Sequence, residues 1–291
     1  MTRPEKPKSV PQAPAAISGT LGVRVLRAGV QDRTNADDRV AVEAPLEIQL
    51  HHPILGVQPV SFGATMRTPG EDEALAVGLL YGEGIVNQAS DIELIEASTR
   101  RPNVINVRLH THVQLDMQPP VRRFSAGSSC GVCGITGLDG AISRAASMRV
   151  TASDRVDLAV LLRLPTLMRE WQSKFADTGG IHAAALFDFS GSLLGISEDV
   201  GRHNALDKLV GMNLLAGKLP LNNAIVLLSG RISFELVQKA LRAGTAVLAA
   251  IGAPSSLSVN LAQGTGLTLV GFVRDTHCNV YAHPERLENP T

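Results

Sequence analysis

Two short apolar runs decide the fold of this chain: Ala224-Ile-Val-Leu-Leu-Ser229 and Thr245-Ala-Val-Leu-Ala-Ala-Ile251. Their residues do not alternate between apolar and polar, so each run predicts a strand that is buried on both faces. Helical periodicity over Phe234–Arg242 connects the two runs, and a helix over Ser256–Gln263 leads to the last expected strand, over Leu267–Val273. This alternation of strands and helices predicts a parallel sheet with helices against it.

The rest of the C-terminal half continues the same pattern. Its expected elements are strands over Ile181–Asp188 and Leu193–Ser197, a helix over Asn204–Leu215, and two earlier helices that begin near Ser153 and at Pro165. Proline is expected at the start of a helix because it has no N–H to donate within one. We therefore predict an α/β domain with a largely parallel sheet over residues 151–291.

The N-terminal half has shorter runs that alternate more. Expected strands cover Val23–Arg27, Arg39–Glu43, Leu46–Leu50, Val57–Met66, Ile92–Ala97 and Asn103–Leu109. Thr68 is the expected N-cap of a helix that has Pro69 in its first turn and stops at Gly82 or Gly84. These elements predict a mixed α+β domain over residues 20–118. Residues 1–19 are rich in proline and lack periodicity, which predicts a disordered tail.

Composition argues against several classes of protein. Lys and Arg together number 27, and so do Asp and Glu, so the chain has no overall basic charge for non-specific binding to nucleic acid. No apolar run approaches the roughly 20 residues that cross a membrane. The three cysteines are odd in number and no N-terminal apolar run follows basic residues, so we expect neither a secretory route nor a disulfide framework. We expect a cytoplasmic protein with no nucleic-acid and no membrane partner.

Two of the cysteines stand close together in Cys130-Gly-Val-Cys133, within a stretch rich in glycine and serine. This composition predicts a mobile loop, and we assign residues 119–150 to this loop and a linker. The pair can belong to a structural zinc site completed by Cys278 and His277, to a redox dithiol, or to a carrier that takes up sulfur as a persulfide; it can also be two buried cysteines without chemistry. A mobile loop suits the carrier, because its thiol must meet a donor and then an acceptor.

Polar residues follow four of the expected strands of the C-terminal half. They are Glu198–His203, Ser229-Gly230-Arg231, Gly252–Ser256 and Arg274–His277. Ligands of open parallel sheets bind beyond the carboxyl ends of the strands, so these sets are expected to share one edge. Their serines, glycines and arginines suit phosphate groups, although each arginine on its own can be a solvated surface charge. The sequence contains neither a P-loop nor a Rossmann motif.

His182 lies in the stretch Thr178-Gly-Gly-Ile-His182-Ala, at the start of an expected strand. It can serve as a ligand or a base, or it can be a hydrogen-bonded core residue. Zinc deaminases combine H-x-E with a later P-C-x-x-C, whereas Ala184 stands two residues after His182 and the C-x-x-C lies upstream. The sequence therefore lacks the acid–base residue of metal-activated hydrolysis, and we expect no metal site.

Five stretches together resemble the formate dehydrogenase accessory sulfurtransferase family. They are Cys130-Gly-Val-Cys133-Gly, Thr178-Gly-Gly-Ile-His182-Ala, Glu198-Asp-Val-Gly-Arg-His-Asn-Ala-Leu-Asp-Lys208, Ser229-Gly-Arg-Ile-Ser-Phe-Glu-Leu236 and Gly271-Phe-Val-Arg-Asp. The resemblance runs from about residue 20 to about residue 287. It implies a cytidine-deaminase-like C-terminal domain and a cytoplasmic protein that forms a homodimer.

The resemblance also implies an enzymatic function, that of a sulfurtransferase. Such a protein accepts sulfur from a cysteine desulfurase as a persulfide and transfers it to the molybdenum bis(molybdopterin guanine dinucleotide) cofactor of formate dehydrogenase. The first cysteine of the family motif carries the persulfide and corresponds to Cys130, and we expect Cys133 to assist sulfur release. The family's cofactor segment corresponds to Phe272, Val273, Arg274, Asp275, Thr276 and His277, to which we add Ser229, Gly230 and Arg231 at the expected phosphate edge.

A function of another class stays open beside this one. The alternative hypothesis is a non-enzymatic chaperone that binds the molybdenum cofactor and delivers it to formate dehydrogenase. Both functions need a site for a cofactor with pyrophosphate groups, which the strand-end residues suit. Only the sulfurtransferase needs the thiol of Cys130, so this residue distinguishes the two.

Overall fold

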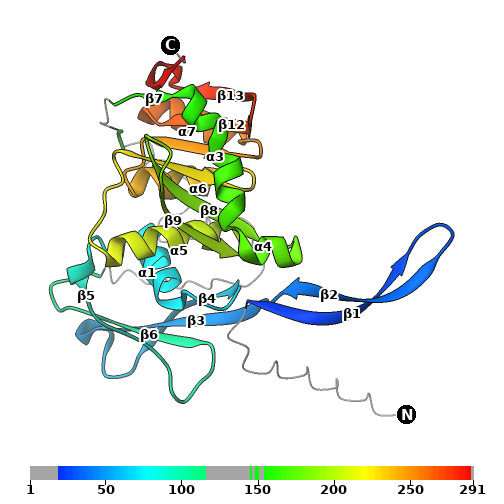
Figure 1. Cartoon of the computed structure of the whole chain (residues 1–291). Coiled ribbons are helices and arrows are strands. Elements are labelled where there is room, and N and C mark those ends of the chain that lie inside the picture. Colours follow the sequence, from blue (N-terminus) through cyan, green and yellow to red (C-terminus); the bar gives the residue numbers. More distant parts are fainter. Residues whose placement is uncertain (1–18, 116–144, 146–147, 151–153, 290–291) are drawn as a thin grey trace, which may run out of the picture.

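The computed structural model of the chain describes residues 19–115, 145, 148–150 and 154–289 (Figure 1). Cys130 and Cys133 lie outside these residues, as does nearly all of the tail predicted over residues 1–19. What the sequence predicts for these segments therefore stays a prediction. The described part contains a four-stranded and a six-stranded sheet, with a hairpin and a short strand pair beside them.

The N-terminal part is a four-stranded sheet with one helix against it. Its elements are β1 (Thr20–Ala28), β2 (Arg33–Ala41), β3 (Ala44–His51), β4 (Val60–Arg67), α1 (Asp72–Gly82), β5 (Ile92–Ala97) and β6 (Val104–Leu109). β1 and β2 form an antiparallel hairpin that extends away from the rest of the molecule (Figure 1). The sheet has the order β4-β3-β6-β5, in which β3 and β6 are parallel and the other neighbours antiparallel. Leu46, Ile48 and Leu50 alternate along β3 and are buried, so one face of this sheet lies against the core.

The C-terminal part is built on the six-stranded sheet. Its elements are β7 (Val156–Asp157), α3 (Leu158–Trp171), α4 (Ser173–Thr178), β8 (His182–Asp188), β9 (Leu193–Asp199), α5 (Arg202–Leu215), β10 (Ala224–Leu228), α6 (Phe234–Arg242), β11 (Val247–Ala250), α7 (Ser256–Thr265), β12 (Thr268–Arg274), β13 (His277–Ala282) and β14 (Leu287–Glu288). The order of the sheet is β13-β12-β11-β10-β8-β9. No helix among the described residues is long and apolar enough to cross a membrane.

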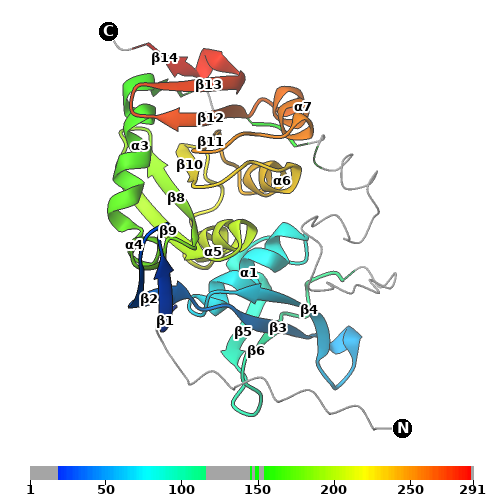
Figure 2. The same cartoon turned by 90° about the vertical axis from the view of Figure 1, so that its right-hand side faces the viewer.

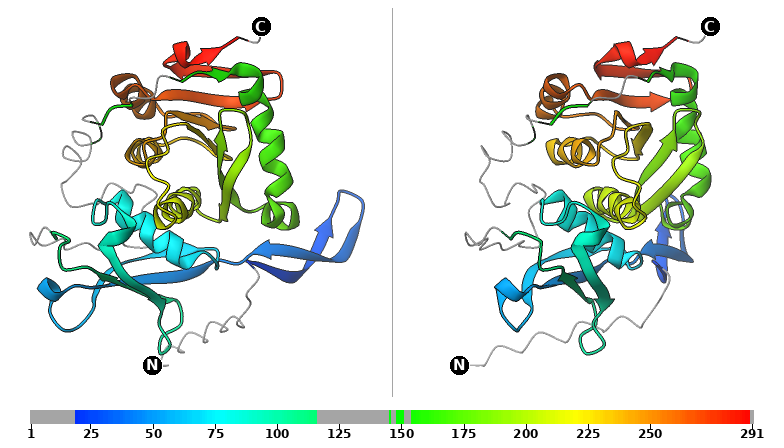
Figure 3. Two further views of the ribbon diagram at one scale, coloured as in Figure 1. Left: turned by 60° about the vertical axis from the view of Figure 1, so that its left-hand side comes forward. Right: turned by 90° about the vertical axis from the view of Figure 1, so that its left-hand side faces the viewer.

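Helices cover both faces of the six-stranded sheet (Figures 2 and 3). α3 packs on one face, and α5, α6 and α7 form a layer on the other. All five residues of β10 are buried, as its apolar sequence predicts. The α/β fold class is confirmed, and the parallel part of the sheet consists of β10, β11 and β12, with antiparallel strands outside them.

The helix α3 corrects the prediction of two separate helices. It begins at Leu158 and continues through Pro165, which lies in its interior. An interior proline costs a helix about 3 kcal/mol. Leu161, Leu164 and Met168 are buried on both sides of the proline and belong to the core cluster of the sheet. Tertiary burial on both sides therefore keeps the helix continuous.

Thr68 is not the N-cap of α1, which begins only at Asp72. The backbone N–H of Thr68 donates to Asp199 Oδ2 at 3.0 Å, and its hydroxyl accepts from the N–H of Val200 at 3.1 Å. Its carbonyl accepts from Lys208 Nζ at 2.8 Å. Thr68 thus connects the N-terminal part to the C-terminal part through these hydrogen bonds. Its partners lie more than 130 positions away in the sequence, so a local pattern could not reveal them.

The helices α1 and α5 cross in close contact at two glycines. A Cβ atom at Gly78 would overlap the carbonyl oxygen of Asp207, and one at Gly211 would overlap that of Ala74. Only residues without a Cβ atom allow the two backbones to approach this closely. This crossing decides how the two parts of the chain are placed against each other.

The strand predicted over Leu267–Val273 is not the last one. β12 ends at Arg274, and β13 pairs with it in the antiparallel direction. Asp275 and Thr276 form the turn between them. The six residues expected to bind cofactor therefore lie on a hairpin at the strand ends.

Candidate functional site

The carboxyl ends of four strands meet at one edge of the six-stranded sheet, as the sequence predicts. β10, β11 and β12 are parallel, and β9 runs in the same direction because β8 is antiparallel to both β9 and β10. α5, α6 and α7 begin at this edge because each of them follows one of these strands. Helix N-termini carry partial positive charge, so the edge favours an anion.

The loops beyond the strand ends are held in register by backbone hydrogen bonds. The N–H of Ser229 donates to the carbonyl of Ala183 at 3.0 Å, and the N–H of Gly252 donates to the carbonyl of Gly230 at 3.1 Å. The N–H of Phe272 donates in turn to the carbonyl of Gly252 at 3.1 Å. A Cβ atom at Gly252 would lie 2.6 Å from the Gly230 oxygen, so this close approach requires glycine. The edge is therefore a continuous backbone surface.

His182 stands at the start of β8 and lies against the loop after β10. Its Nδ1 is 3.4 Å from Ser229 Oγ, which also accepts from the N–H of Ala183 at 2.8 Å. Burial, followed by the positive charges of Arg202 and His203, lowers the pKa of the His182 ring below its ordinary value. Nearby cations oppose its protonation, so a bound anion would favour it.

Two guanidinium groups at this edge lack partners within the described part of the chain. Arg231, in the loop after β10, makes no hydrogen bond or ion pair there. Arg202 opens α5, and its Nε is buried without a hydrogen-bond partner. Burying the unpaired Nε of Arg202 is unfavourable, whereas Arg231 is exposed to solvent, so both side chains are available to a ligand. The sequence placed both arginines in the sets expected at this edge, but it named only Arg231 as a cofactor-binding residue.

His203 joins the N-terminal ends of α5 and α6. Its Nε2 lies 3.0 Å from Ser233 Oγ and 3.8 Å from Glu235 Oε2. The close approach of the His203 ring is the largest influence on Glu235 and lowers the pKa of this carboxyl to about 2. Glu235 is thus an anion engaged with His203, and among the residues that the structure describes Arg202 and Arg231 remain as cations without a partner at this end of the helix layer.

The side chains of the segment expected to bind cofactor, Phe272–His277, do not all lie at the strand-end edge. Phe272 has a left-handed backbone with φ of 53° at a bulge in β12, and its side chain is 38% exposed at the edge. Arg274 Nη1 donates to the carbonyls of Ile251 at 2.8 Å and Val273 at 2.7 Å.

The other members of this segment point elsewhere. The Val273 side chain is buried in the core. Asp275 accepts from the hydroxyl of Thr166 on α3 at 2.9 Å, and Thr276 Oγ1 lies 3.1 Å from His277 Nδ1. The structure therefore brings Phe272 to the backbone surface of Ser229, Gly230 and Gly252, whereas Asp275 faces α3.

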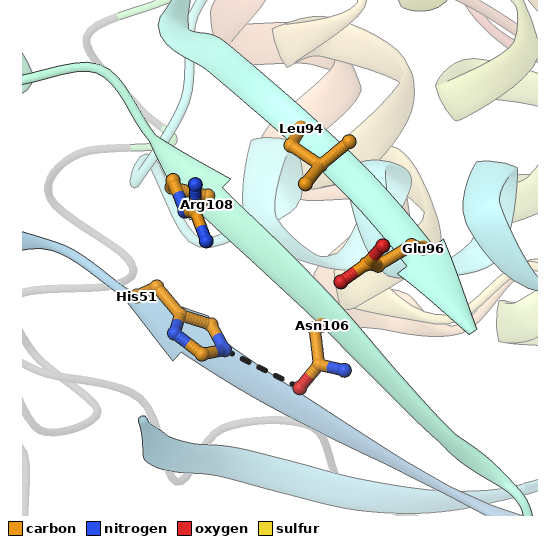
Figure 4. A pocket seen from close by; sticks show the side chains of 5 residues that line it. All are labelled: His51, Leu94, Glu96, Asn106 and Arg108. Atoms are coloured by element: carbon orange, nitrogen blue, oxygen red, sulfur yellow. Dashed lines mark hydrogen bonds between the residues drawn. The ribbon is translucent and has the colours of Figure 1, made fainter. Parts of the chain in front are cut away.

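A small hollow on the N-terminal sheet is separate from this edge (Figure 4). His51, Leu94, Glu96, Asn106 and Arg108 line it, and His51 Nε2 lies 3.3 Å from Asn106 Oδ1. These side chains come from β3, β5 and β6, on the face turned away from the buried residues of β3. Its two charged side chains, Glu96 and Arg108, are of opposite sign, so the hollow has no excess positive charge for a phosphate group.

No group of three or more metal-ligating side chains comes together among the described residues. Cys278 is half-buried on β13, and burial raises the pKa of its thiol. The zinc site proposed with Cys278 needs Cys130 and Cys133, which lie outside the described residues. That alternative therefore stays open as the sequence left it.

Comparison with known proteins assigns the chain to a family. Residues 41–288 match the FdhD/NarQ family, which is most of the 291-residue chain. The chain belongs to the FdhD/NarQ family. The resemblance drawn from the five sequence stretches is thereby confirmed.

Relatives in the FdhD/NarQ family cover nearly the whole chain. The sulfur carrier protein FdhD of Streptomyces avermitilis is 45% identical over 261 residues, which are 86% of this chain and 89% of that protein. FdhD of Saccharolobus solfataricus is 40% identical over 273 residues, 92% of this chain and 100% of that protein. The crystal structure of a candidate formate dehydrogenase accessory protein from Desulfotalea psychrophila has a TM-score of 0.72 and 25% identity, and covers 93% of this chain and 100% of that one.

In this FdhD/NarQ chain, the stretch from Glu198 to Lys208 serves mainly to hold the structure together. Glu198 accepts from the backbone N–H groups of Lys174 and Phe175 at the start of α4. Asp199, Asn204, Asp207 and Lys208 are buried and hydrogen-bonded to residues of the N-terminal part, α6 or each other. Among the charged residues of the stretch, Arg202, His203 and Asp199 act on the ring of His182, and of these three Asp199 is fully engaged in holding the two parts of the chain together.

Proposed function

We propose that this chain is a sulfurtransferase that serves formate dehydrogenase. It accepts sulfur from a cysteine desulfurase as a persulfide on Cys130 and transfers the sulfur to the molybdenum bis(molybdopterin guanine dinucleotide) cofactor. Membership of the FdhD/NarQ family supports this, as do the relatives described as sulfur carriers and the structural relative described as a formate dehydrogenase accessory protein. We further propose a cytoplasmic homodimer.

One observation in the structure supports cofactor binding above all others. Arg202 and Arg231 bring unpaired guanidinium groups to an edge where three helices begin, within the part of the chain that the structure describes. A guanine dinucleotide carries a pyrophosphate, and guanidinium groups and helix N-termini are the groups that bind phosphate oxygens. Ser229, Gly230 and Phe272 extend this surface and suit the rest of the nucleotide.

The proposed sulfur transfer uses two thiols, those of Cys130 and Cys133. The Cys130 thiolate attacks the outer sulfur of the desulfurase persulfide, and the donor cysteine leaves as a thiolate. Cys133 then attacks the inner sulfur of the Cys130 persulfide, which forms a disulfide and releases the outer sulfur as hydrosulfide at the cofactor. A dithiol reductant returns the disulfide to two thiols before the next cycle.

Sulfur loading is the experiment that tests this function. The protein is incubated with a cysteine desulfurase and cysteine, and intact mass with peptide mapping should find one added sulfur on Cys130. Cys278→Ser is the matched control and should load as the wild type does. A Cys130→Ala protein that still binds cofactor and still matures formate dehydrogenase would instead establish the alternative, a non-enzymatic cofactor chaperone.

A further inference from the structure

The hairpin of β1 and β2 extends away from the rest of the molecule (Figures 1 and 3). Its two strands, Thr20–Ala28 and Arg33–Ala41, pair over their full length without a bulge. The base of the hairpin packs on α4, but Leu26 is 57% exposed and Val30 at the tip is fully exposed. An isolated two-stranded hairpin is marginally stable in water, and a third strand or a packed face is needed to stabilise it. This hairpin, which we call the arm, therefore needs a covering element.

One face of the arm is largely apolar. Leu21, Val23 and Val25 alternate along β1, so their side chains share this face. Val40 of β2 stands opposite Leu21, and Asp38 stands opposite Val23 as a charged member of the face. Leu21 and Val40 are 43% and 41% exposed. Exposed apolar side chains that gather on one face mark a surface for another protein chain. The arm therefore offers an apolar face as well as a strand edge.

The outer edge of β1 presents backbone groups that β2 does not use. The N–H of Gly29 donates to the carbonyl of Asp32 at 2.8 Å, and the N–H of Val42 donates to the carbonyl of Gly19 at 2.9 Å. Antiparallel strands bond to each other at every second residue, so these two bonds turn the odd-numbered residues of β1 toward β2. The N–H and C=O groups of the even-numbered residues, such as Arg24, point away from β2. In the part of the chain that the structure describes, β1 pairs with no strand besides β2.

This edge lacks most of the usual protection of an exposed strand. Natural edges are blunted by proline, by a bulge, by short length or by charge. β1 has nine residues, no proline and no bulge. Its charged residues are Arg24 and Arg27, and Arg24 Nε lies 3.8 Å from Asp37 Oδ1 on the neighbouring strand, which offsets its charge. The outer edge of β1 is therefore suited to pair with another strand.

A second copy of the same chain fits this edge. Two copies of β1 related by a two-fold axis run antiparallel, have equal length and bring their apolar faces to the same side of the sheet. The opposite edge of the arm belongs to β2, whose base packs on α4 and whose Arg39 pairs with Asp177 of that helix at 3.4 Å. Pairing through β1 is thus a closed contact between two copies and does not continue into a fibre.

The charges of β1 restrict how two copies can be aligned. A pairing centred on Arg24 sets two guanidinium groups directly opposite each other, which is unfavourable. A pairing centred on Val23 or Val25 instead places Arg24 opposite Gly22 or Leu26 of the second copy. In both of these alignments the even-numbered residues meet, so their outward N–H and C=O groups bond to each other.

We propose that two copies of the chain join through the outer edges of β1, so that their arms form one four-stranded antiparallel sheet in the order β2-β1-β1-β2. Four strands with a shared apolar face meet the requirement that a single hairpin does not. The main-chain hydrogen bonds supply affinity in such strand pairing, and the alternate side chains supply specificity. The inference rests on the homodimer of the proposed function and goes further in naming its surface.

A proline at position 24 tests the edge itself. The N–H of Arg24 points away from β2, so Arg24→Pro removes a donor from the outer edge and leaves the bonds between β1 and β2 in place. The variant should be monomeric by light scattering at concentrations at which the wild type is a dimer. Arg24→Ala is the matched control, because it loses the same side chain but keeps the N–H, and it should remain a dimer. A dimeric Arg24→Pro protein overturns the proposal, and so does a monomeric Arg24→Ala protein.

Amide exchange in the wild type gives an answer that does not depend on how the proline variant folds. In a free arm, the outward N–H groups of Gly22, Arg24 and Leu26 exchange with solvent faster than those of the odd-numbered residues between them, which bond to β2. NMR should find both sets equally protected in the dimer, and dilution to the monomer should restore the alternation. Alternation that persists in a dimer shows that the copies join elsewhere and overturns the proposal.

The same measurement separates a second copy from another partner. A wild type that is monomeric, with outer-edge amides protected only after a cysteine desulfurase or formate dehydrogenase is added, assigns the arm to that protein and overturns the second copy. A wild type that is monomeric under all of these conditions overturns it as well. Sulfur loading on Cys130 is measured separately, so the arm can fail as a dimer surface while the sulfurtransferase stands.

Discussion

Lys208 Nζ lies 2.8 Å from Asp199 Oδ2, and the two side chains are 1% and 0% exposed. Thr68 completes the arrangement, because its N–H donates to Asp199 and its carbonyl accepts from Lys208. The ion pair therefore connects the C-terminal sheet and α5 to the chain just before α1. Both charged side chains stay shielded from water as long as the N-terminal and C-terminal parts pack against each other.

Lys208→Met should destabilise the protein strongly. Removing one partner leaves Asp199 buried as an unpaired anion, which costs about 3–5 kcal/mol of unfolding free energy. Urea unfolding measures the loss. Arg155→Met serves as the control, since its pair with Glu288 is exposed and contributes about 0–1 kcal/mol. Equal losses in the two variants would contradict the structural role of the buried pair.

Gly78→Ala should disrupt the crossing of α1 and α5. The added Cβ atom overlaps the backbone oxygen of Asp207, so the helices must separate, and we expect a loss of about 3 kcal/mol, the upper end for overpacking. Gly264→Ala is a matched change in α7 with nothing within 4 Å of the new atom. It should stabilise by about 0.5 kcal/mol, because alanine is the better helix former. Thermal unfolding of both variants checks the contrast.

Guanine nucleotide binding should depend on the strand-end arginines and not on the cysteines. Guanosine diphosphate should raise the melting temperature of the wild type, and Arg231→Ala or Arg274→Ala should weaken binding by roughly 1.5–3 kcal/mol. Cys130→Ser should leave the temperature shift intact. Wild-type shifts in both arginine variants would remove the strand-end edge from the proposed function.

The three cysteines should differ in reactivity and in function. Cys130→Ser should abolish formate dehydrogenase maturation, whereas Cys133→Ser should retain a detectable fraction, because only one thiol carries the transferred sulfur. Timed alkylation with mass mapping should label Cys130 first and Cys278 last, since Cys278 is half-buried and burial raises its thiol pKa. Faster labelling and sulfur on Cys133 would reverse the two roles.

Glu235 should contribute to stability only above acidic pH. Its pKa is lowered from 4.5 to about 2, chiefly by the nearby ring of His203, so the folded state favours the anion. The contribution is complete above pH 4.5 and is lost as pH falls toward 2. The stability difference between wild type and Glu235→Gln should therefore shrink over this range in urea unfolding. Glu96→Gln, on the exposed side of β5, is the control, and a pH-independent difference for Glu235 would refute the assignment.

Local patterns predicted most elements because their signals lie within each segment. The apolar run that forms β10 has no polar residue to face solvent, and α6 has the predicted bounds of Phe234–Arg242. The signals failed at Pro165 and Thr68. In both cases contacts with distant residues outweigh a local preference: a buried stripe across the proline, and hydrogen bonds to Asp199 and Lys208 at the threonine.

The candidate site was predicted only in part for the same reason. Ser229, Gly230 and Arg231 could be nominated because they follow an obvious strand. Arg202 could not be separated from its neighbours, and Asp275 could not be known to face Thr166 of α3 rather than the edge.

The sequence by itself determined the family, the paired cysteines, the alternation of strands and helices, and the edge at which polar residues gather. These follow from residue types and their spacing along the chain. Only the tertiary structure decided which polar residues hold the protein together and which remain available to a ligand. Asp199 and Arg202 stand three positions apart, yet one is buried in bonds to Thr68 and Lys208 while the other has a buried nitrogen without a partner in the described residues. Their difference comes from what packs against each side chain, and those neighbours lie far away in the sequence.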